Sequence, residues 1–337
     1  MNGERHGGNV WQGGEPGGWL DFSASLRPEG PPPWAVEAMR RGIDEARFYP
    51  DREMRGAREG LASWLGVPPE CVLPTAGGMA AIDLALAADR GTVYTERTTF
   101  GEYALRAAAH GRKRAEWQGC CAAGDTVVLR NPNNPTGAAR EREEVLSLAE
   151  TVQGRGARLL VDEAFVSFCP EVSVAGEMQS GVIVAGSLTK ALCLPGIRLG
   201  YLCADLQTIK RMEELALPWA LSAPAACVAQ ALPEHRQELA ADAERNRIRR
   251  ESFAAALRAL GAKVGASRAN FLLADFGRDM TAAAARLKAE RILVRTCASF
   301  ALGPGFWRLG VRTEAENGRL IDALSRILKE EPCGERA

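Results

Sequence analysis

Between residues 71 and 203 the chain alternates short apolar runs with longer amphipathic segments, and this alternation constrains its fold more than any other feature. Strands that alternate with helices indicate crossover connections, and therefore a largely parallel sheet with helices on both faces. Unbroken apolar runs such as Leu159-Leu160-Val161 fit strands that are buried on both sides. The apolar runs predict strands over Cys71–Pro74, Thr92–Tyr94, Thr126–Leu129, Arg158–Val161, Val182–Ala185 and Leu199–Cys203, with helices over about 79–88, 100–109, 141–152 and 205–216.

The chain has 337 residues, a length that favours two domains. We expect a Gly/Pro-rich N-terminal arm over 1–30, a large domain over 31–222 and a smaller α+β domain over 223–337. The large domain is expected to open with helices over Trp34–Gly42 and Met54–Leu65. In the small domain the sequence predicts a long helical stretch over 224–260 with a break near Pro233. It also predicts strands over Phe271–Asp275, Leu293–Thr296 and Trp307–Arg312, and helices near 280–289 and 314–329.

Charge and cysteine usage exclude several classes of protein. Lys plus Arg (42) equals Asp plus Glu (42), so no net charge attracts nucleic acid or an anionic membrane. The nine cysteines are scattered and form no C-x-x-C pair, which argues against a disulfide framework and against a metal site. Reduced thiols indicate a cytoplasmic protein. The polar N-terminus is no signal peptide, and Pro218 and Pro224 interrupt the apolar segment 215–232, which favours burial over a membrane span.

Polar residues follow the predicted strands at the edge where an open α/β sheet binds its ligands. Each group alone could be a turn, a helix cap or a solvated strand end, but together and in this order they indicate a site. The groups are Thr75-Ala-Gly-Gly-Met79, Arg130-Asn-Pro-Asn-Asn-Pro-Thr-Gly137, Asp162-Glu-Ala-Phe165, and Gly186-Ser-Leu-Thr-Lys190 followed by Gly196-Ile-Arg-Leu-Gly-Tyr201.

These residue types are those that the chemistry of pyridoxal phosphate (PLP) requires. The Lys190 amine can form an imine with the cofactor aldehyde, Asp162 can keep the ring nitrogen protonated, and Asn134 can donate to the ring oxygen. The cofactor phosphate needs an anion site. Backbone N–H groups at a helix start would provide it together with a hydroxyl and a guanidinium, from Gly77, Gly78, Met79, Ser187 and Arg198.

Over nearly its whole length the chain resembles the fold-type I aminotransferases, in the branch of histidinol-phosphate aminotransferase and threonine-phosphate decarboxylase. The resemblance rests on Asn-Pro-x-Asn-Pro-Thr-Gly, Asp-Glu-Ala-aromatic, and Ser-x-Thr-Lys followed by Arg-x-Gly-Tyr. It implies the aspartate-aminotransferase-like fold, with a mostly parallel central sheet and a smaller α+β C-terminal domain. It also implies that Lys190 is the imine lysine and proton shuttle, that Asn134 and Asp162 contact the ring, and that Ser187 and Arg198 bind the phosphate.

The resemblance extends to residues outside these motifs. It implies that Phe100 stacks on the cofactor ring and that Arg308 grips the substrate α-carboxylate. Tyr49 resembles the tyrosine that reaches the cofactor phosphate of a neighbouring subunit, which implies a homodimer with shared active sites.

The resemblance leaves two reactions open, transamination and decarboxylation. His6-Gly-Gly-Asn9 with Asp21-Phe-Ser-Ala24, and Phe165 where transaminases of this branch carry Tyr, resemble the decarboxylase that supplies the cobalamin side chain. This reading favours a small phospho-amino acid substrate such as O-phospho-L-threonine. It implies substrate contacts from the residues His6, Ser25, Arg27, Arg308 and Arg312, although Ser25 and Arg27 replace asparagines of the family's arm motif.

Competing classes of protein lack their own motifs. A nicotinamide-binding enzyme needs G-x-G-x-x-G and a P-loop NTPase needs G-x-x-x-x-G-K-[ST], and neither motif occurs. A PLP-fold sensor without catalysis would carry a DNA-binding extension, which the sequence does not indicate.

Overall fold

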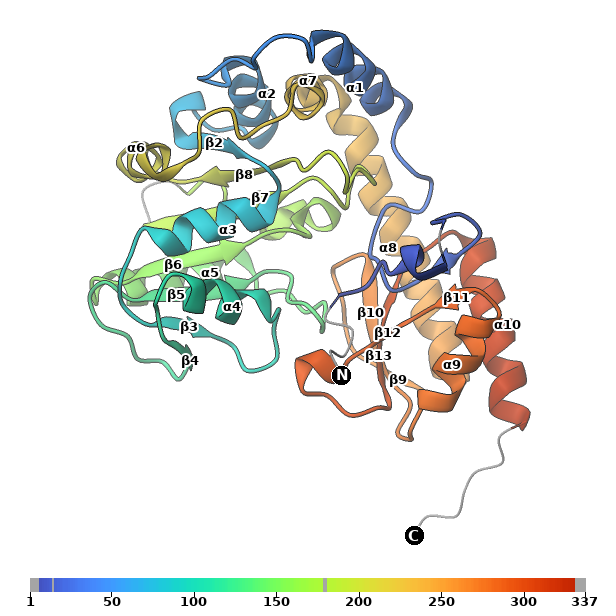
Figure 1. Ribbon diagram of the computed structural model, residues 1–337. Helices are drawn as coiled ribbons and strands as arrows, with labels where there is room; N and C mark the ends of the chain where they lie inside the picture. The colour runs from blue at the N-terminus through green and yellow to red at the C-terminus, as the bar shows by residue number, and fades with distance from the viewer. Residues whose placement is uncertain (1–5, 14, 178–180, 331–337) are drawn as a thin grey trace.

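The computed structural model describes residues 6–13, 15–177 and 181–330 and has a large unit around a seven-stranded sheet and a smaller unit around a four-stranded sheet (Figure 1). The large sheet has the order β2-β8-β7-β6-β5-β3-β4. All neighbouring strands run parallel except those that pair with β8, which is antiparallel to both β2 and β7. The strands are β2 (Val72–Thr75), β3 (Val93–Thr95), β4 (Arg114–Glu116), β5 (Thr126–Arg130), β6 (Arg158–Asp162), β7 (Val182–Ser187) and β8 (Gly200–Cys203).

Helices cover both faces of this sheet, as the sequence pattern predicts. The central strands β5 and β7 are buried at every residue, which accounts for their unbroken apolar runs. Two apolar cores lie on opposite faces, one against α1, α2, α5 and α7 and the other against α3, α4 and α6. The helices are α1 (Pro33–Glu45), α2 (Arg55–Leu65), α3 (Gly78–Ala87), α4 (Glu102–Ala109), α5 (Arg142–Gln153), α6 (Leu206–Leu215) and α7 (Ala223–Ala231).

Local sequence signals fix where several of these helices begin. Pro33 stands at the first position of α1, where its missing N–H costs no hydrogen bond. Asp205 caps α6 by accepting from the Thr208 amide at 2.9 Å, and Ser222 caps α7. Gly77 precedes α3 with a φ of 86°, a conformation that favours glycine.

The predicted helical stretch 224–260 is broken as expected. After α7 a short 3-10 turn over Leu232–His235 contains the proline, and the long helix α8 (Arg236–Ala259) then runs into the smaller unit (Figure 1). Because α7 packs against α1 and α2, its core belongs to the large unit. The three-part division at residues 30 and 222 stays a prediction, and part of the expected arm lies outside the described residues.

The smaller unit has its own apolar core under a sheet of order β12-β13-β10-β9. The strand predicted over Leu293–Thr296 is divided, because β11 pairs with β1 while β12 pairs with β13. The β1–β11 pairing attaches the N-terminal segment to the smaller unit. The remaining elements are β1 (Leu20–Asp21), β9 (Lys263–Val264), β10 (Phe271–Asp275), α9 (Thr281–Ala289), β11 (Ile292–Leu293), β12 (Arg295–Thr296), β13 (Phe306–Gly310) and α10 (Glu314–Glu330).

The described residues contain no helix long and apolar enough to cross a membrane. They also contain no cluster of three or more His, Cys, Asp or Glu side chains that could hold a metal ion, and no disulfide joins their eight cysteines.

Candidate active site

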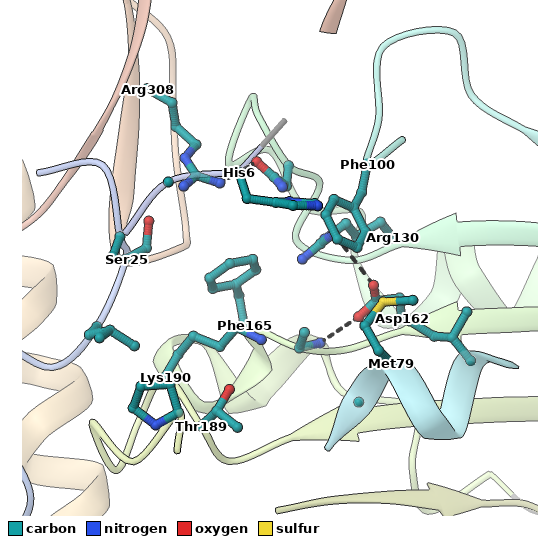
Figure 2. A pocket seen from close by; sticks show the side chains of 18 of the residues that line it. His6, Ser25, Met79, Phe100, Arg130, Asp162, Phe165, Thr189, Lys190 and Arg308 are labelled. Atoms are coloured by element: carbon teal, nitrogen blue, oxygen red, sulfur yellow. Dashed lines mark hydrogen bonds and ion pairs between the residues drawn. The ribbon is translucent and has the colours of Figure 1, made fainter. Parts of the chain in front are cut away.

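The carboxyl ends of β5, β6 and β7 meet the start of α3 at one cavity of about 360 Å³ (Figure 2). The N-terminal segment and β13 of the smaller unit close its other side. The strand register aligns these ends, since Arg130 of β5 pairs with Asp162 of β6, which pairs with Ala185 of β7. Residues that line the cavity are His6, Gly7, Ser23, Ala24, Ser25, Leu26, Gly78, Met79, Ile82, Phe100, Arg130, Asn134, Asp162, Ala164, Phe165, Thr189, Lys190, Pro195, Arg198 and Arg308.

Lys190 follows β7 and extends its amine into the buried part of this cavity (Figure 2). Its Nζ lies 3.2 Å from Ser187 Oγ. Burial, followed by the charge of Arg130, lowers the pKa of Lys190 to about 8. About a tenth of this amine is therefore neutral and nucleophilic at pH 7, far more than for an ordinary lysine.

Asp162 ends β6 and is only 1% exposed. Its Oδ1 accepts from the Ala164 amide at 2.9 Å, and its Oδ2 accepts from the Tyr103 hydroxyl at 2.5 Å. Nη1 of Arg130 lies 3.5 Å from the same Oδ2. These donors hold the carboxylate toward the cavity and leave it able to pair with one further cationic or N–H group.

An anion site is formed where α3 begins. A Cβ on Gly77 would lie 2.6 Å from Arg198 Nη2, and a Cβ on Gly78 would lie 3.0 Å from Ser187 Cβ, so a side chain at either position would crowd the groups of this site. The free N–H groups and the dipole of the ten-residue helix favour a negative charge here. The Ser187 and Thr189 hydroxyls lie 2.9 Å apart beside it.

Arg308 reaches the cavity from β13. Its Nη1 donates to Asn134 Oδ1 at 2.7 Å, and its Nη2 donates to the Ser23 carbonyl at 2.8 Å. Burial, followed by the positive charges of Arg295 and Arg130, lowers the pKa of Arg308 to about 9. A buried guanidinium whose hydrogen-bond acceptors among the described residues are uncharged is stabilised by an anionic ligand.

Aromatic side chains form two walls of the cavity. Phe165 packs against Phe271 with ring centroids 4.9 Å apart, and Phe100 packs against Tyr103 at 5.7 Å. The His6 ring lies 5.9 Å from that of Phe100. These rings leave a slot that suits a flat ligand.

The N-terminal segment supplies a polar roof. His6 Nε2 lies 2.9 Å from Glu102 Oε1, so the ring is oriented by α4. The buried Ser25 Oγ has no hydrogen-bond partner among the described residues. Both side chains line the cavity and are therefore available to a ligand (Figure 2).

Five predicted site residues are not among those that line the cavity, namely Gly77, Ser187, Arg27, Arg312 and Tyr49. Gly77 and Ser187 border it, next to the lining residues Arg198 and Gly78. The other three lie away from it. Arg27 instead forms a buried ion pair with Asp242, with 2.8 Å between Nε and Oδ2, so its charge is already neutralised. Arg312 pairs with Glu316 at 2.9 Å. Tyr49 is 85% exposed and packs against Trp219 with ring centroids 5.2 Å apart. The positions of Arg27 and Arg312 therefore do not support direct substrate contacts.

Sequence reasoning missed Arg130, Tyr103 and Thr189. Arg130 and Thr189 line the cavity, and Tyr103 contacts it through Asp162. The strand-end position of Arg130 was a usable signal, because it stands directly before the Asn-Pro run. Tyr103 gave no comparable signal, because Phe100 precedes α4 and the contact of Tyr103 with Asp162 arises only in the folded chain.

The residues present fit a phosphorylated pyridine aldehyde. Lys190 provides an amine with a lowered pKa, Asp162 a carboxylate, and Gly77 and Gly78 an anion site that any Cβ would fill. Four cationic side chains line the cavity, namely those of Arg130, Lys190, Arg198 and Arg308, whereas Asp162 is the one carboxylate among its described lining residues. This excess of positive charge suits a cofactor phosphate together with an anionic substrate.

Residues 18–324 match the family model described as aminotransferase class I and II. The chain is 30% identical to a threonine-phosphate decarboxylase of Salmonella typhimurium, with 96% of each chain covered. It is 28% identical to a histidinol-phosphate aminotransferase of Haloferax volcanii, over 95% of this chain and 92% of that one. The solved histidinol-phosphate aminotransferase of Clostridium acetobutylicum superposes with a TM-score of 0.82 at 23% identity, covering 92% of this chain and 99% of that one.

Proposed function

The chain belongs to the class I and II aminotransferase family, and on this basis we propose that it decarboxylates O-phospho-L-threonine or a similar phospho-amino acid. Its cofactor is pyridoxal 5'-phosphate. A decarboxylase of this kind would supply the amino alcohol phosphate of the cobalamin side chain.

In this proposal each cofactor group has a named residue. Lys190 bonds to the aldehyde, Asp162 faces the ring nitrogen and Asn134 donates to the ring oxygen. Phe100 stacks on the ring and Phe165 packs beside it. The phosphate is bound by the start of α3 with a hydroxyl and a guanidinium, from the residues Gly77, Gly78, Met79, Ser187 and Arg198. The pKa of Lys190 and the two close-packed glycines support this placement.

When bound, the cofactor supplies an electron sink for whichever bond of the substrate α-carbon stands perpendicular to its ring. Arg308 binds the substrate α-carboxylate and so determines which bond that is. The Lys190 amine is buried and has a pKa near neutrality, so it can hold a proton and return it to the α-carbon after CO₂ has left. Phe165 and the roof residues exclude water from the reacting carbon.

The observation that favours decarboxylation over transamination is the polar N-terminal segment that covers the cavity. His6 and the unpartnered Ser25 hydroxyl line the cavity with Arg308, which gives the substrate side of the site polar groups for a second anion. Phe165 supports the same reading, because it provides no hydroxyl to the ring oxygen. The name of the Salmonella typhimurium relative agrees with it.

Transamination of the histidinol-phosphate type is the second candidate. The Haloferax volcanii relative carries that name, and the residues that hold the cofactor do not discriminate between the two reactions. Both substrates bear a phosphate, but O-phospho-L-threonine also brings an α-carboxylate for Arg308, whereas histidinol phosphate has none.

One assay separates the two reactions. Purified holoenzyme is incubated with O-phospho-L-threonine, and in parallel with histidinol phosphate and 2-oxoglutarate. We expect CO₂ and aminopropanol phosphate in the first reaction and no glutamate in the second. Lys190→Ala serves as the control and should lose both turnover and the visible absorption of the bound cofactor. Glutamate formation without CO₂ release would contradict the proposal.

We also propose that the protein acts as a homodimer with shared active sites. Large apolar side chains lie exposed on the α1–α2 and α6–α7 connections and on α1, and a second copy of the chain would cover them. They are Ile43, Phe48, Tyr49, Leu217 and Trp219. Tyr49 would then reach the cofactor phosphate of the neighbouring subunit.

A mixing experiment tests the shared site. Lys190→Ala protein and Tyr49→Ala protein are each inactive or impaired, but a hybrid dimer contains one site in which Lys190 and Tyr49 are both intact. We expect the mixture to regain visible absorption and turnover at that site. Sedimentation as a monomer, or a mixture no more active than its components, would contradict the proposal.

A further inference from the structure

Arg130 is a buried cation inside the cavity for which the proposed reaction has no assigned role. Its side chain is only 5% exposed, and among the described residues neither Nε nor Nη1 has a hydrogen-bond partner. Buried guanidinium groups in proteins normally satisfy their N–H groups with hydrogen bonds, because burying an unsatisfied polar group is costly. An arginine left in this state at the wall of a cavity indicates a role toward what the cavity binds.

The surroundings of this guanidinium are aromatic on two sides. Its central carbon lies 4.6 Å from the ring centroid of Phe100 and 5.0 Å from that of Phe165 (Figure 2). These rings replace water around the charge, so the Coulomb field of Arg130 acts on nearby groups with little screening. Phe100 and Phe165 are also the aromatic walls of the cofactor slot, which puts the cation beside the bound ring.

Asp162 is the carboxylate to which Arg130 is directed. The strand register makes the two residues neighbours at the ends of β5 and β6, and 3.5 Å separates Arg130 Nη1 from Asp162 Oδ2. That oxygen already accepts from Tyr103. Asp162 is thus shared among a hydroxyl, a guanidinium and whichever group of the ligand faces it.

We propose that Arg130 is a positioning residue that shares Asp162 with the ring nitrogen of the bound cofactor and so weakens the hold of that nitrogen on its proton. This inference rests on the proposed placement of Asp162 opposite the ring nitrogen, and not on which reaction the enzyme performs. A permanent positive charge close to a protonated nitrogen destabilises the protonated form, and a carboxylate partly neutralised by arginine compensates less for that charge.

Titratable and charged groups from every element around the cofactor slot also affect how strongly the ring nitrogen holds its proton. Burial and the charge of Arg130 both lower the pKa of Lys190, whereas Asp162 raises it. Among the described arginines, Arg130 is the one paired with Asp162. Among the described residues these groups are His6 from the N-terminal segment, Glu102 and Tyr103 from α4, Arg130 from β5, Asp162 from β6, Lys190 and Arg198 from the segment after β7, and Arg308 from β13.

The test compares two ligands that differ at the ring nitrogen alone. Apoprotein is titrated with pyridoxal phosphate and with its 1-deaza analogue, in which carbon replaces that nitrogen. Arg130→Met should increase the preference for pyridoxal phosphate over the analogue by about tenfold, because the protonated nitrogen no longer meets an opposing charge. Arg130→Lys keeps the charge and should stay close to the wild-type preference.

A second readout is the pH dependence of the visible absorption of the holoenzyme. Removing a positive charge stabilises the protonated chromophore, so Arg130→Met should move the absorption midpoint upward by about one pH unit. Tyr103→Phe is the matched control, because it removes a donor from the same Asp162 oxygen without changing the charge. It should produce a clearly smaller shift than Arg130→Met.

Several outcomes would overturn the inference. An Arg130→Met protein that loses affinity for both ligands equally would show a packing role only. An unchanged preference combined with a raised KM for the substrate would assign Arg130 to substrate binding. If Arg130→Met does not fold, Arg130→Gln is used with the same criteria. If the wild type binds pyridoxal phosphate but Arg130→Met does not change the preference between the two ligands, this inference alone is rejected. If the wild type binds no cofactor at all, the proposed function is rejected as well.

Discussion

The Tyr103 hydroxyl donates a 2.5 Å hydrogen bond to Oδ2 of Asp162, joining α4 to the end of β6 inside the large unit. Both side chains are almost completely buried. Burial, followed by the negative charge of Asp162, raises the pKa of Tyr103 well above its usual value, so the phenol remains a donor at every working pH. The carboxylate is therefore held in one orientation before any ligand arrives.

Tyr103→Phe should weaken cofactor binding, because Asp162 loses the donor that holds its carboxylate in position toward the cavity. Hydrogen bonds to charged groups contribute about 1.5–3 kcal/mol, which corresponds to a loss of about tenfold or more in affinity for pyridoxal phosphate. Fluorescence titration of the apoprotein measures this change. Tyr94→Phe is the control, since Tyr94 packs against Trp117 away from the cavity. Equal affinities for the two variants would contradict the prediction.

The apoprotein should capture pyridoxal phosphate faster as pH rises, with a midpoint near 8. The neutral amine of Lys190 is the nucleophile, and burial and neighbouring cations lower its pKa to about 8 from the ordinary 10.5. Below pH 7 most Lys190 amines are protonated, and above pH 9 the rate should level off. Stopped-flow absorbance on mixing gives the profile. A midpoint near 10.5 would mean that Lys190 is not in the buried environment described above.

Gly77→Ala should reduce affinity for pyridoxal phosphate more than affinity for pyridoxal, which lacks the phosphate. The added Cβ would lie 2.6 Å from Arg198 Nη2 and would displace that guanidinium from the anion site. Loss of one charge-assisted bond predicts a phosphate-specific change of about tenfold or more. Gly66→Ala separates crowding from backbone strain, since Gly66 also has a positive φ but faces open space. If both variants lose the two ligands equally, the phosphate is not bound at this helix start.

Stability should fall as pH rises from about 5 to about 8, with Glu163 as a main cause. Burial raises the pKa of Glu163 to about 7 from 4.5, so the folded chain holds a proton that the unfolded chain releases. The stabilisation is complete below pH 4.5 and is lost as pH passes 7. Glu163→Gln should reduce the change in the free energy of unfolding across this pH range by about 1–3 kcal/mol. Denaturant unfolding at several pH values measures this change. The exposed Glu116→Gln should leave the dependence unchanged, and a pH-independent wild type would contradict the prediction.

Much of the fold could be predicted because local patterns determined it. The strands after residue 71 and the break at Pro233 follow from apolar runs and from proline chemistry. The antiparallel direction of β8 could not be predicted, because it depends on pairing with β2 and β7, which lie far apart in the sequence. The division of the strand predicted over Leu293–Thr296 has the same cause, since its halves pair with different strands.

The candidate site likewise contains some residues that the sequence could identify and others that it could not. Lys190 and Asp162 could be found because a parallel sheet brings strand ends together, and both line the cavity. Tyr103 could not be assigned from its own neighbours, because its role arises from a contact across two elements. Arg27 was predicted to contact the substrate, but the folded chain places Asp242 beside it and so neutralises its charge.

The contact between the Arg308 guanidinium and the Ser23 carbonyl has a practical consequence for handling the protein. The N-terminal segment forms part of the cavity wall, so an affinity tag fused ahead of His6 would emerge next to the catalytic chamber. Helix α10 ends at Glu330, on the outer side of the smaller unit (Figure 1). Purification handles and immobilisation linkers are therefore better attached at the carboxyl terminus, and kinetic constants obtained with amino-terminal fusions should be compared with those of the cleaved protein.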